Sequence, residues 1–282
     1  MHSVQLLGCG KTFCTVHPRN ELWKAFPPSF QAAALDASVS ELVAATQPPE
    51  HVDSVSAYQR KLLKQADHAA ASFVVPPCGL TRDVLQSLLY LTTDCGFLFK
   101  ENPLQQLNGV LARRFEDPDA PYDAAHFIFL AHSALATLPR VDFRDGASLC
   151  WAAFVPRDKL PQALSKFQEK TVLYSEAYVP AVQSVQELEC VANTATELLS
   201  SFDSARESNA LVLFVMDVDA SDGTRVPVAH DISALERNAD TQTMVHEVLL
   251  DPGFQATVTS VSDSGAIAAS GVAVAKIVHL HF

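Results

Sequence analysis

The sequence of 282 residues contains no run of about 18 apolar residues, the length that a membrane-spanning helix requires. We therefore expect no membrane partner. Basic residues are also scarce, because 20 Lys and Arg stand against 32 Asp and Glu and leave a net charge of −12. Nucleic-acid binding depends on concentrated Lys and Arg, so this balance argues against nucleic acid as a partner.

The beginning of the sequence lacks the apolar centre of about 7–15 residues that marks a secretory signal. The cysteines show no tightly repeated spacing either: they are Cys9, Cys14, Cys78, Cys95, Cys150 and Cys190. Both absences favour reduced thiols in an intracellular compartment. Only 18% of the residues are charged and 48% are hydrophobic, which argues against extensive disorder and for a sizeable core.

Two sequence patterns that suggest a bound phosphate or metal ion are incomplete. Residues 6–12 lack the first glycine of a phosphate-binding loop, because Gln5 stands where it is needed. Residues 217–223 resemble the start of a calcium loop, but Val228 takes the place of its bidentate glutamate. A zinc site at Cys9, Cys14 and His17 would need further ligands at a suitable spacing, and none follows. We predict no metal site.

The first half of the sequence repeats its apolar residues at the spacing of helices. Ser54 is a candidate N-cap, Thr81 begins a further periodic segment, and prolines end several of these segments. The expected helices are residues 31–47, 54–74, 81–97, 104–115 and 124–140.

The second half changes to runs typical of strands. The expected strands are residues 146–156, 170–179, 210–218, 246–252, 254–262 and 273–282, with helices at 156–167 and 188–202. Helices first and strands later predict an α+β fold, in which a helical N-terminal lobe packs on a mixed or antiparallel sheet.

Several stretches, in order along the chain, resemble the arginine-type mono-ADP-ribosyltransferase family. Residues 87–115 resemble its helix pair, including a Leu-Asn step, and 127–139 resemble the helix that ends in Leu-Pro before the first core strand. Residues 210–218 are similar to the central strand. Residues 230–261 match a run of Ile-Ser, a polar loop, an acidic residue before Val-Leu-Leu, Pro-Gly and a Val-Thr-Ser-Val strand.

This resemblance implies an ADP-ribosyltransferase-type domain over residues 81–282. Residues 1–80 fit only as a variable helical N-terminal region, which we expect to form one compact unit with the domain.

The resemblance also implies an NAD site with three parts. In the family, an arginine on the first core strand holds NAD, a Ser-Thr-Ser on a later strand shapes the nicotinamide pocket, and a glutamate stabilises the oxocarbenium-like charge as nicotinamide leaves. Glu247 matches this catalytic glutamate. The second glutamate of arginine-modifying members, two residues earlier, is replaced by Val245.

The other two parts are replaced in this chain. The Tyr-Arg-Gly of the family becomes Cys150-Trp151-Ala152, which predicts that Trp151 projects into the pocket where the arginine reached NAD. The Phe-x-Ser-Thr-Ser becomes residues 178–182, which keep an aromatic residue, Tyr178, and lose all three hydroxyl positions.

These losses predict a pseudoenzyme that binds no cofactor tightly. We expect a binding or scaffold subunit with a protein partner, in the cytoplasm or a cytoskeletal assembly. The alternative is a divergent mono-ADP-ribosyltransferase or NAD glycohydrolase that uses Glu247. A third hypothesis is an interaction protein of a different, mainly helical fold.

Three residues keep two interpretations each. Arg144 supplies the missing guanidinium if the first core strand begins earlier than residue 146. Tyr178 either stacks on a nicotinamide or packs across the sheet, and Glu247 is either a site residue or an exposed charge at the start of a strand.

Overall fold

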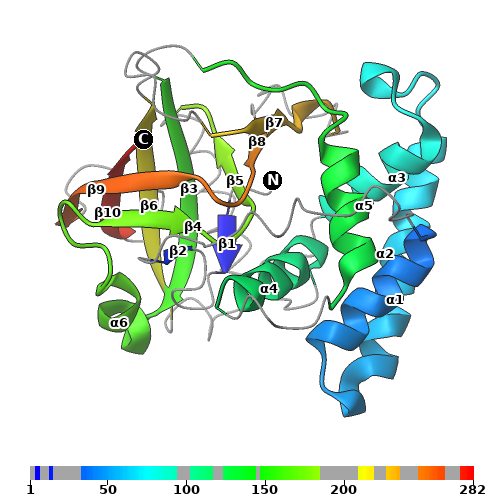
Figure 1. Cartoon of the computed structure of the whole chain (residues 1–282), viewed down its shortest axis with the longest axis horizontal. Coiled ribbons are helices and arrows are strands. Elements are labelled where there is room, and N and C mark those ends of the chain that lie inside the picture. The colour runs from blue at the N-terminus through cyan, green and yellow to red at the C-terminus, as the bar shows by residue number, and fades with distance from the viewer. Residues whose placement is uncertain are drawn as a thin grey trace.

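The chain folds into a layer of helices packed against a mixed β-sheet, as Figure 1 shows in the computed structural model. The structure describes residues 4–6, 13–14, 33–93, 102–116, 123–143, 147–184, 209–218, 227–235, 247–263 and 274–282. The predicted helix at 188–202 and most of the incomplete phosphate and metal patterns lie outside these residues. The α+β class predicted from the sequence is confirmed.

The helical layer contains the five helices predicted in the first half of the chain. They are α1 (Leu35–Thr46), α2 (Val52–Ala71), α3 (Arg82–Leu91), α4 (Pro103–Glu116) and α5 (Ala125–Leu135). Thr81 caps α3, since its hydroxyl accepts a hydrogen bond from the Val84 N–H at 3.4 Å. The predicted cap Ser54 is wrong. The short helix η1 (Pro49–His51) starts the turn earlier, and the Ser54 hydroxyl donates to the His51 carbonyl.

The sheet joins segments from both ends of the sequence. Its strands are β1 (Val4–Leu6), β2 (Phe13–Cys14), β3 (Ala147–Pro156), β4 (Val172–Ser175), β5 (Val179–Val182), β6 (Asn209–Val218), β7 (Ala229–Asp231), β8 (Glu247–Leu250), β9 (Gln255–Asp263) and β10 (Val274–His281). They lie in the order β2-β4-β9-β10-β6-β3-β5-β8-β7, with β1 paired to β3 beside this path. The pairs β1–β3 and β6–β10 are parallel and the others antiparallel, so the sheet is mixed.

Two strands differ from their predicted boundaries. The predicted strand 170–179 is two strands, because a turn at residues 176–178 separates β4 from β5. The Ser175 hydroxyl stabilises this turn: it donates to the Ala177 carbonyl at 2.7 Å and accepts from the Ala177 N–H. The short strand β7 was not predicted. The helical segment after β3 is brief and consists of η3 (Arg157–Lys159) and α6 (Leu160–Leu164).

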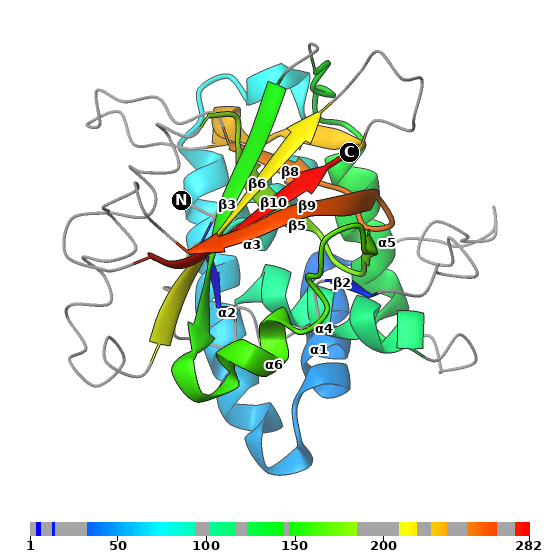
Figure 2. The same ribbon diagram turned by 90° about the vertical axis from the view of Figure 1, so that its left-hand side faces the viewer.

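Apolar side chains fill both faces of the sheet. On one face the five long helices pack against sheet residues that include Tyr178, Ile232 and Leu249. On the other face the strands bury their own cluster, to which α6 adds Ala163. Figure 2 shows the sheet in front of the helices, with α6 on the viewer's side. We call these clusters the helical-side core and the outer core.

None of the described helices combines the length and the apolarity that a bilayer crossing requires. Of the cysteines that the structure describes, Cys78 and Cys150 are free thiols.

The centre of the outer core is the pair Trp151 and Phe214. Their rings stack with centroids 5.1 Å apart and planes only 3° from parallel, and both side chains are fully buried. We predict that Trp151→Ala lowers the free energy of unfolding by about 3–5 kcal/mol, because it removes a large buried ring and leaves a cavity. Urea unfolding measures this change. Val74→Ala is the control, since Val74 is 98% exposed, and an equal loss in both variants would contradict the assignment.

Candidate functional site

The three segments that the sequence pattern relates to an NAD site lie on neighbouring strands. Strand β5 pairs with β3 on one side and with β8 on the other. The register places Cys150 of β3 opposite Val182 of β5, and Val182 opposite Glu247 of β8. These three residues therefore form one row across the sheet, with the Cα atoms of Cys150 and Glu247 about 10 Å apart. We call it the Glu247 row.

All three members of the Glu247 row are fully buried. Side chains alternate between faces along a strand, and Leu249 of β8 belongs to the helical-side core, so Glu247 points to that same face. The interpretation of Glu247 as an exposed charge is therefore wrong. Its carbonyl accepts hydrogen bonds from the Ile232 N–H at 3.1 Å and from the Ser233 hydroxyl at 3.2 Å, which anchor the start of β8.

Trp151 does not occupy the position that the sequence predicted. It follows Cys150 by one residue, so its side chain points to the other face of the sheet, where it stacks on Phe214 in the outer core. The residue of β3 that faces the same side as Glu247 is the thiol of Cys150. The expectation that Trp151 blocks the pocket beside Glu247 is thus corrected: its ring packs the core behind the sheet.

Tyr178 lies immediately before β5, inside the helical-side core, and is 1% exposed. Packing is the role that this position supports. The side chain of Asn108 on α4 holds the Tyr178 backbone with two hydrogen bonds of 2.9 Å: its Nδ2 donates to the Tyr178 carbonyl, and its Oδ1 accepts from the Tyr178 N–H. Sequence reasoning noted the Leu-Asn step but assigned Asn108 no role. A polar residue on the packed face of an amphipathic helix is the signal that could have found it.

A second polar group lies at the far end of β8 from Glu247. His230 of β7 and Asp251 are both buried, and His230 Nε2 lies 3.1 Å from Asp251 Oδ1. Continuing the β5–β8 register places Tyr178 opposite Asp251. Burial, together with the negative charge of Asp251, raises the pKa of the Tyr178 hydroxyl well above its ordinary value of 10.0. The sequence did not indicate the His230–Asp251 pair, because the two residues lie 21 positions apart and no local spacing relates them.

No described Lys or Arg side chain is buried, so within these residues no buried cation accompanies Glu247. Arg144, the predicted substitute for the arginine, and Val245 lie outside the described residues. The described part of the chain also contains no cluster of three His, Cys, Asp or Glu residues suited to a metal ion. Glu247 is thus a carboxylate in an otherwise apolar row. Tyr178 and Asp251 lie about four residues, or about 13 Å, along the strand from it, and His230, opposite Leu249, lies about two residues, or about 7 Å, along.

No protein-family model and no curated protein matches this chain. Among solved structures, the chain is similar to the Vis toxin, an ADP-ribosyltransferase from Vibrio splendidus, with 16% identity over 84% of this chain and 88% of the toxin and a TM-score of 0.33. It is also similar to the ADP-ribosyltransferase HopU1 of Pseudomonas syringae pv. tomato, with 10% identity over 89% of this chain and 98% of HopU1 and a TM-score of 0.42.

The type III effector XopAI from Xanthomonas axonopodis pv. citri is a further similar structure, with 13% identity over 89% of this chain and 84% of that chain and a TM-score of 0.38. The Vis and HopU1 structures carry the name of the family that the residue pattern resembles. Superpositions this loose carry no assignment of function, which therefore rests on the residues and their register.

The contribution of the Asn108 side chain to the stability of the fold can be tested by substitution. We predict that Asn108→Ala lowers the free energy of unfolding by about 2–6 kcal/mol, because it leaves the N–H and the carbonyl of Tyr178 without their partners, at about 1–3 kcal/mol each. Chemical denaturation measures the change. Gln168→Ala is the control, since it removes a side-chain hydrogen bond to a backbone carbonyl at an exposed position. Equal losses of stability in the two variants would mean that the Asn108 hydrogen bonds contribute no more than an exposed one.

The raised pKa of Tyr178 predicts that the free energy of unfolding depends on pH. Above about pH 10 the unfolded chain loses the Tyr178 proton while the folded chain keeps it, so stability falls as the pH rises, by up to about 1.4 kcal/mol per pH unit from this group. Tyr178→Phe removes the titrating group, and we expect a shallower alkaline decline, measured by urea unfolding at a series of pH values. Tyr174→Phe on β4 is the matched control. If both variants show the same slope, Tyr178 does not cause the decline.

Proposed function

We propose that this chain is an ADP-ribosyltransferase-type protein whose NAD site no longer works, and that it serves as a binding or scaffold subunit. The observation that carries the proposal is the Glu247 row. The sequence pattern aligns Glu247 with a catalytic glutamate, and the register sets it in one row with β5, the adjacent strand that matches the family's hydroxyl segment, and with β3, the next strand, which matches its arginine segment. In this chain those strands contribute Cys150 and Val182 to the row.

The amount of NAD affinity that these replacements remove supports the proposal of an inactive site. A hydrogen bond to a charged group contributes about 1.5–3 kcal/mol. An arginine and two or three hydroxyls therefore account for several powers of ten in affinity for NAD, at about 1.4 kcal/mol per power of ten. Trp151, which aligns with the arginine, points into the outer core. Within the row, Cys150 is a weak hydrogen-bonding group and Val182 is none, so neither replaces what the family pattern requires.

The burial of the row argues in the same direction. Glu247 and Val182 have no solvent-exposed surface, and the adjacent Leu249 has none either. A dinucleotide could reach Glu247 only if the groups that bury it moved away, and each apolar side chain exposed by such a movement costs about 1.5–3 kcal/mol. Binding energy spent on this opening would not be available for catalysis.

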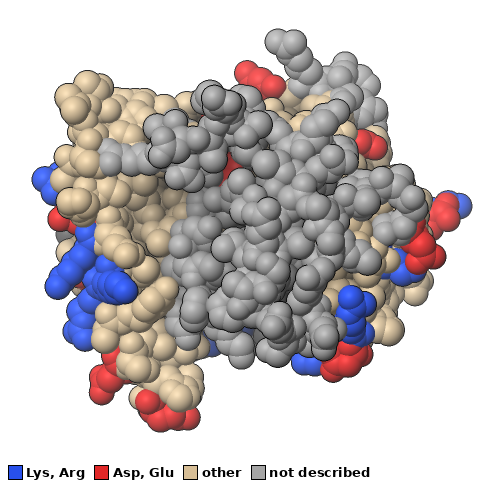
Figure 3. All heavy atoms as spheres, turned by 180° about the vertical axis from the view of Figure 1, so that it is seen from behind, with Lys and Arg blue, Asp and Glu red and all other residues tan. Residues whose placement is uncertain are grey.

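A protein without NAD chemistry would act through its surface, and α2 offers a distinctive one. Arg60, Lys61 and Lys64 are exposed on this helix, in a chain whose net charge is −12. Figure 3 shows Lys and Arg side chains gathered on the side of the molecule where the helices lie. Charge complementarity favours an acidic protein partner for this surface. The cytoplasmic or cytoskeletal location expected from the sequence stays a prediction.

The second candidate function is a divergent mono-ADP-ribosyltransferase or NAD glycohydrolase that uses Glu247. The retention of an acid in the Glu247 row is the observation that favours it, because a fully buried carboxylate is costly to keep and is often functional. NAD binding and turnover distinguish the two candidates.

We predict that NAD at millimolar concentration gives no saturable heat when it is titrated into the purified protein. The physical reason is that no described Lys or Arg is buried near Glu247 and that Val182 stands in the row where the family pattern has a hydroxyl. Isothermal titration calorimetry measures this directly. A saturable isotherm, weakened by substitution of a Glu247-row residue such as Cys150→Phe, would support the enzyme candidate instead.

We also predict that labelled NAD is neither hydrolysed nor transferred above background. The wild type, Glu247→Gln and the exposed control Glu169→Gln should give equal rates, since an inactive site cannot be inactivated further. Circular dichroism first establishes that the variants are folded. A rate in the wild type and in Glu169→Gln that disappears in Glu247→Gln would refute the pseudoenzyme proposal and assign catalysis to Glu247.

A further inference from the structure

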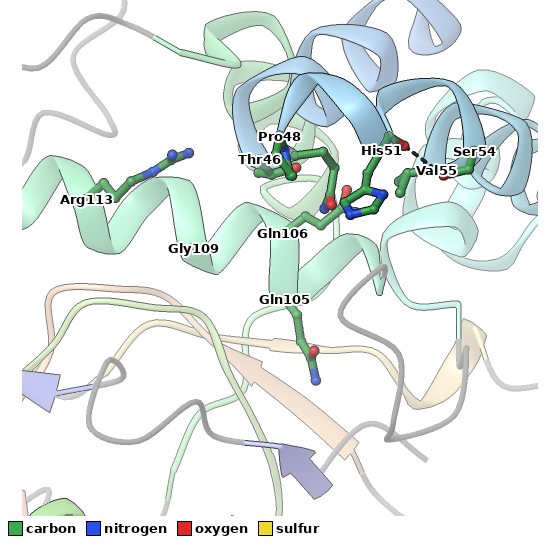
Figure 4. A pocket seen from close by; sticks show the side chains of 10 residues that line it. Thr46, Pro48, His51, Ser54, Val55, Gln105, Gln106, Gly109 and Arg113 are labelled. Carbon is green, nitrogen blue, oxygen red and sulfur yellow. Dashed lines mark hydrogen bonds between the residues drawn. The ribbon is translucent and has the colours of Figure 1, made fainter.

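A pocket of about 730 Å³ lies between α4 and the corner that joins α1 to α2, and we call it the α4 pocket. Figure 4 shows the ten described residues that line it, which come from α4 on one side and from the corner on the other. Gln106 and Asn108 are two residues apart, so they point about 200° apart around the helix. Asn108 holds the sheet, whereas Gln106 faces the corner. The α4 pocket is therefore separate from the Glu247 row.

Gln106 is the unusual residue of the α4 pocket. Its side chain is 3% exposed, and neither its Nε2 nor its Oε1 has a hydrogen-bond partner among the described residues. In Figure 4 it extends from α4 toward His51 at the corner. Each buried polar atom that lacks a partner costs about 1–3 kcal/mol, and buried amides are rarely left in this state. A ligand that offers both an acceptor and a donor would satisfy both atoms at once.

Gly109 keeps the α4 pocket open. A glycine inside a helix costs about 1 kcal/mol relative to alanine. Packing does not require it here, because a Cβ atom at Gly109 would meet no heavy atom within 4 Å. The helix thus carries a destabilising residue where a larger side chain would project into free space along the wall of the pocket.

The charge of the α4 pocket favours an anion. Its described lining contains one cationic side chain, Arg113, and no Asp or Glu. Arg113 Nη2 donates to the Ala45 carbonyl at 2.7 Å, which holds the guanidinium at the end of α1 and uses one of its five N–H donors. The N-terminus of the 20-residue helix α2 also borders the pocket at Ser54 and adds a favourable dipole for negative charge.

We propose that the α4 pocket binds a carboxylate ligand that also carries an amide group, either an N-acylated acidic amino acid or an acidic stretch of peptide. The ligand's amide pairs with the side-chain amide of Gln106, and its carboxylate binds the guanidinium of Arg113. The two residues lie seven positions apart on α4, about 10.5 Å along the helix axis, a gap that their long side chains can shorten. The volume lies within the usual range of small-ligand sites, about 300–1,000 Å³.

Two probes separate the two sources of this chemistry. One is N-acetylglutamate, and the other is a blocked peptide that contains two glutamates. Each is titrated into the full-length protein, and binding is followed by the NMR signals of the Gln106 side-chain amide and by calorimetry. We expect saturable binding of at least one probe. Tighter binding of N-acetylglutamate points to a free metabolite, and tighter binding of the peptide points to a protein segment.

Two substitutions and a matched control test the position of the ligand. Gly109→Phe fills the α4 pocket and should abolish binding, whereas Gly109→Ala adds one methyl group, leaves most of the space and should bind like the wild type. Arg113→Gln removes the cation and should weaken binding by about tenfold or more. Thermal unfolding of each variant shows that it is folded.

Three results would overturn the proposal. The first is that neither probe shifts the NMR signals of Gln106, which would mean that the Gln106 amide binds neither of them. The second is binding that Gly109→Phe does not change, which would place the ligand elsewhere. The third is that glutarate, which has two carboxylates and no amide, binds as well as N-acetylglutamate. This result would mean that Gln106 makes no contribution to recognition of the ligand.

Discussion

The register between β3, β5 and β8 is the constraint on which the interpretation of this protein depends. Because successive residues of a strand point to opposite faces, a shift of one residue exchanges the core side chains of the two faces. The pairing of Cys150 with Val182 and of Val182 with Glu247 places an acid and two small neutral side chains on the helical face, and it sends Trp151 to the other. The stack of Trp151 on Phe214 fixes this choice energetically, since a slipped register would bring the indole under the helices.

This also explains which features could be predicted from the sequence. Helical periodicity and strand-like runs are local signals, and they located five helices and most of the strands to within a few residues. Pairing with distant strands decides which face of the sheet a single residue such as Trp151 occupies. No local sequence pattern contains this information. The same holds for the turn inside residues 170–179, where the Ser175 hydroxyl competes with sheet pairing by bonding to Ala177. The His230–Asp251 pair joins residues 21 positions apart, which no local spacing relates.

Helix α4 connects the two halves of the molecule by using different faces for different tasks. Asn108 replaces backbone hydrogen bonds that Tyr178 lacks at the start of β5, so the helix fixes the point where the central strands meet the helical-side core. Gln106 and Arg113, on the opposite side of the helix, face the α1–α2 corner. The glycine between them weakens α4, whereas the Asn108 contacts strengthen its attachment.

The retained Glu247 has a physical explanation under either candidate function. A carboxylate buried in an apolar surrounding destabilises a fold unless the surrounding groups or a function compensate it. If NAD chemistry had simply been lost, substitution of this acid by an apolar residue would have been favourable. The hydrogen bonds from Ile232 and Ser233 to the Glu247 backbone show that the start of β8 is tightly placed, whatever side chain it carries. The geometry of the strand therefore does not require an acid at this position. The reason for the carboxyl group lies in what the side chain contacts on the helical face of the sheet.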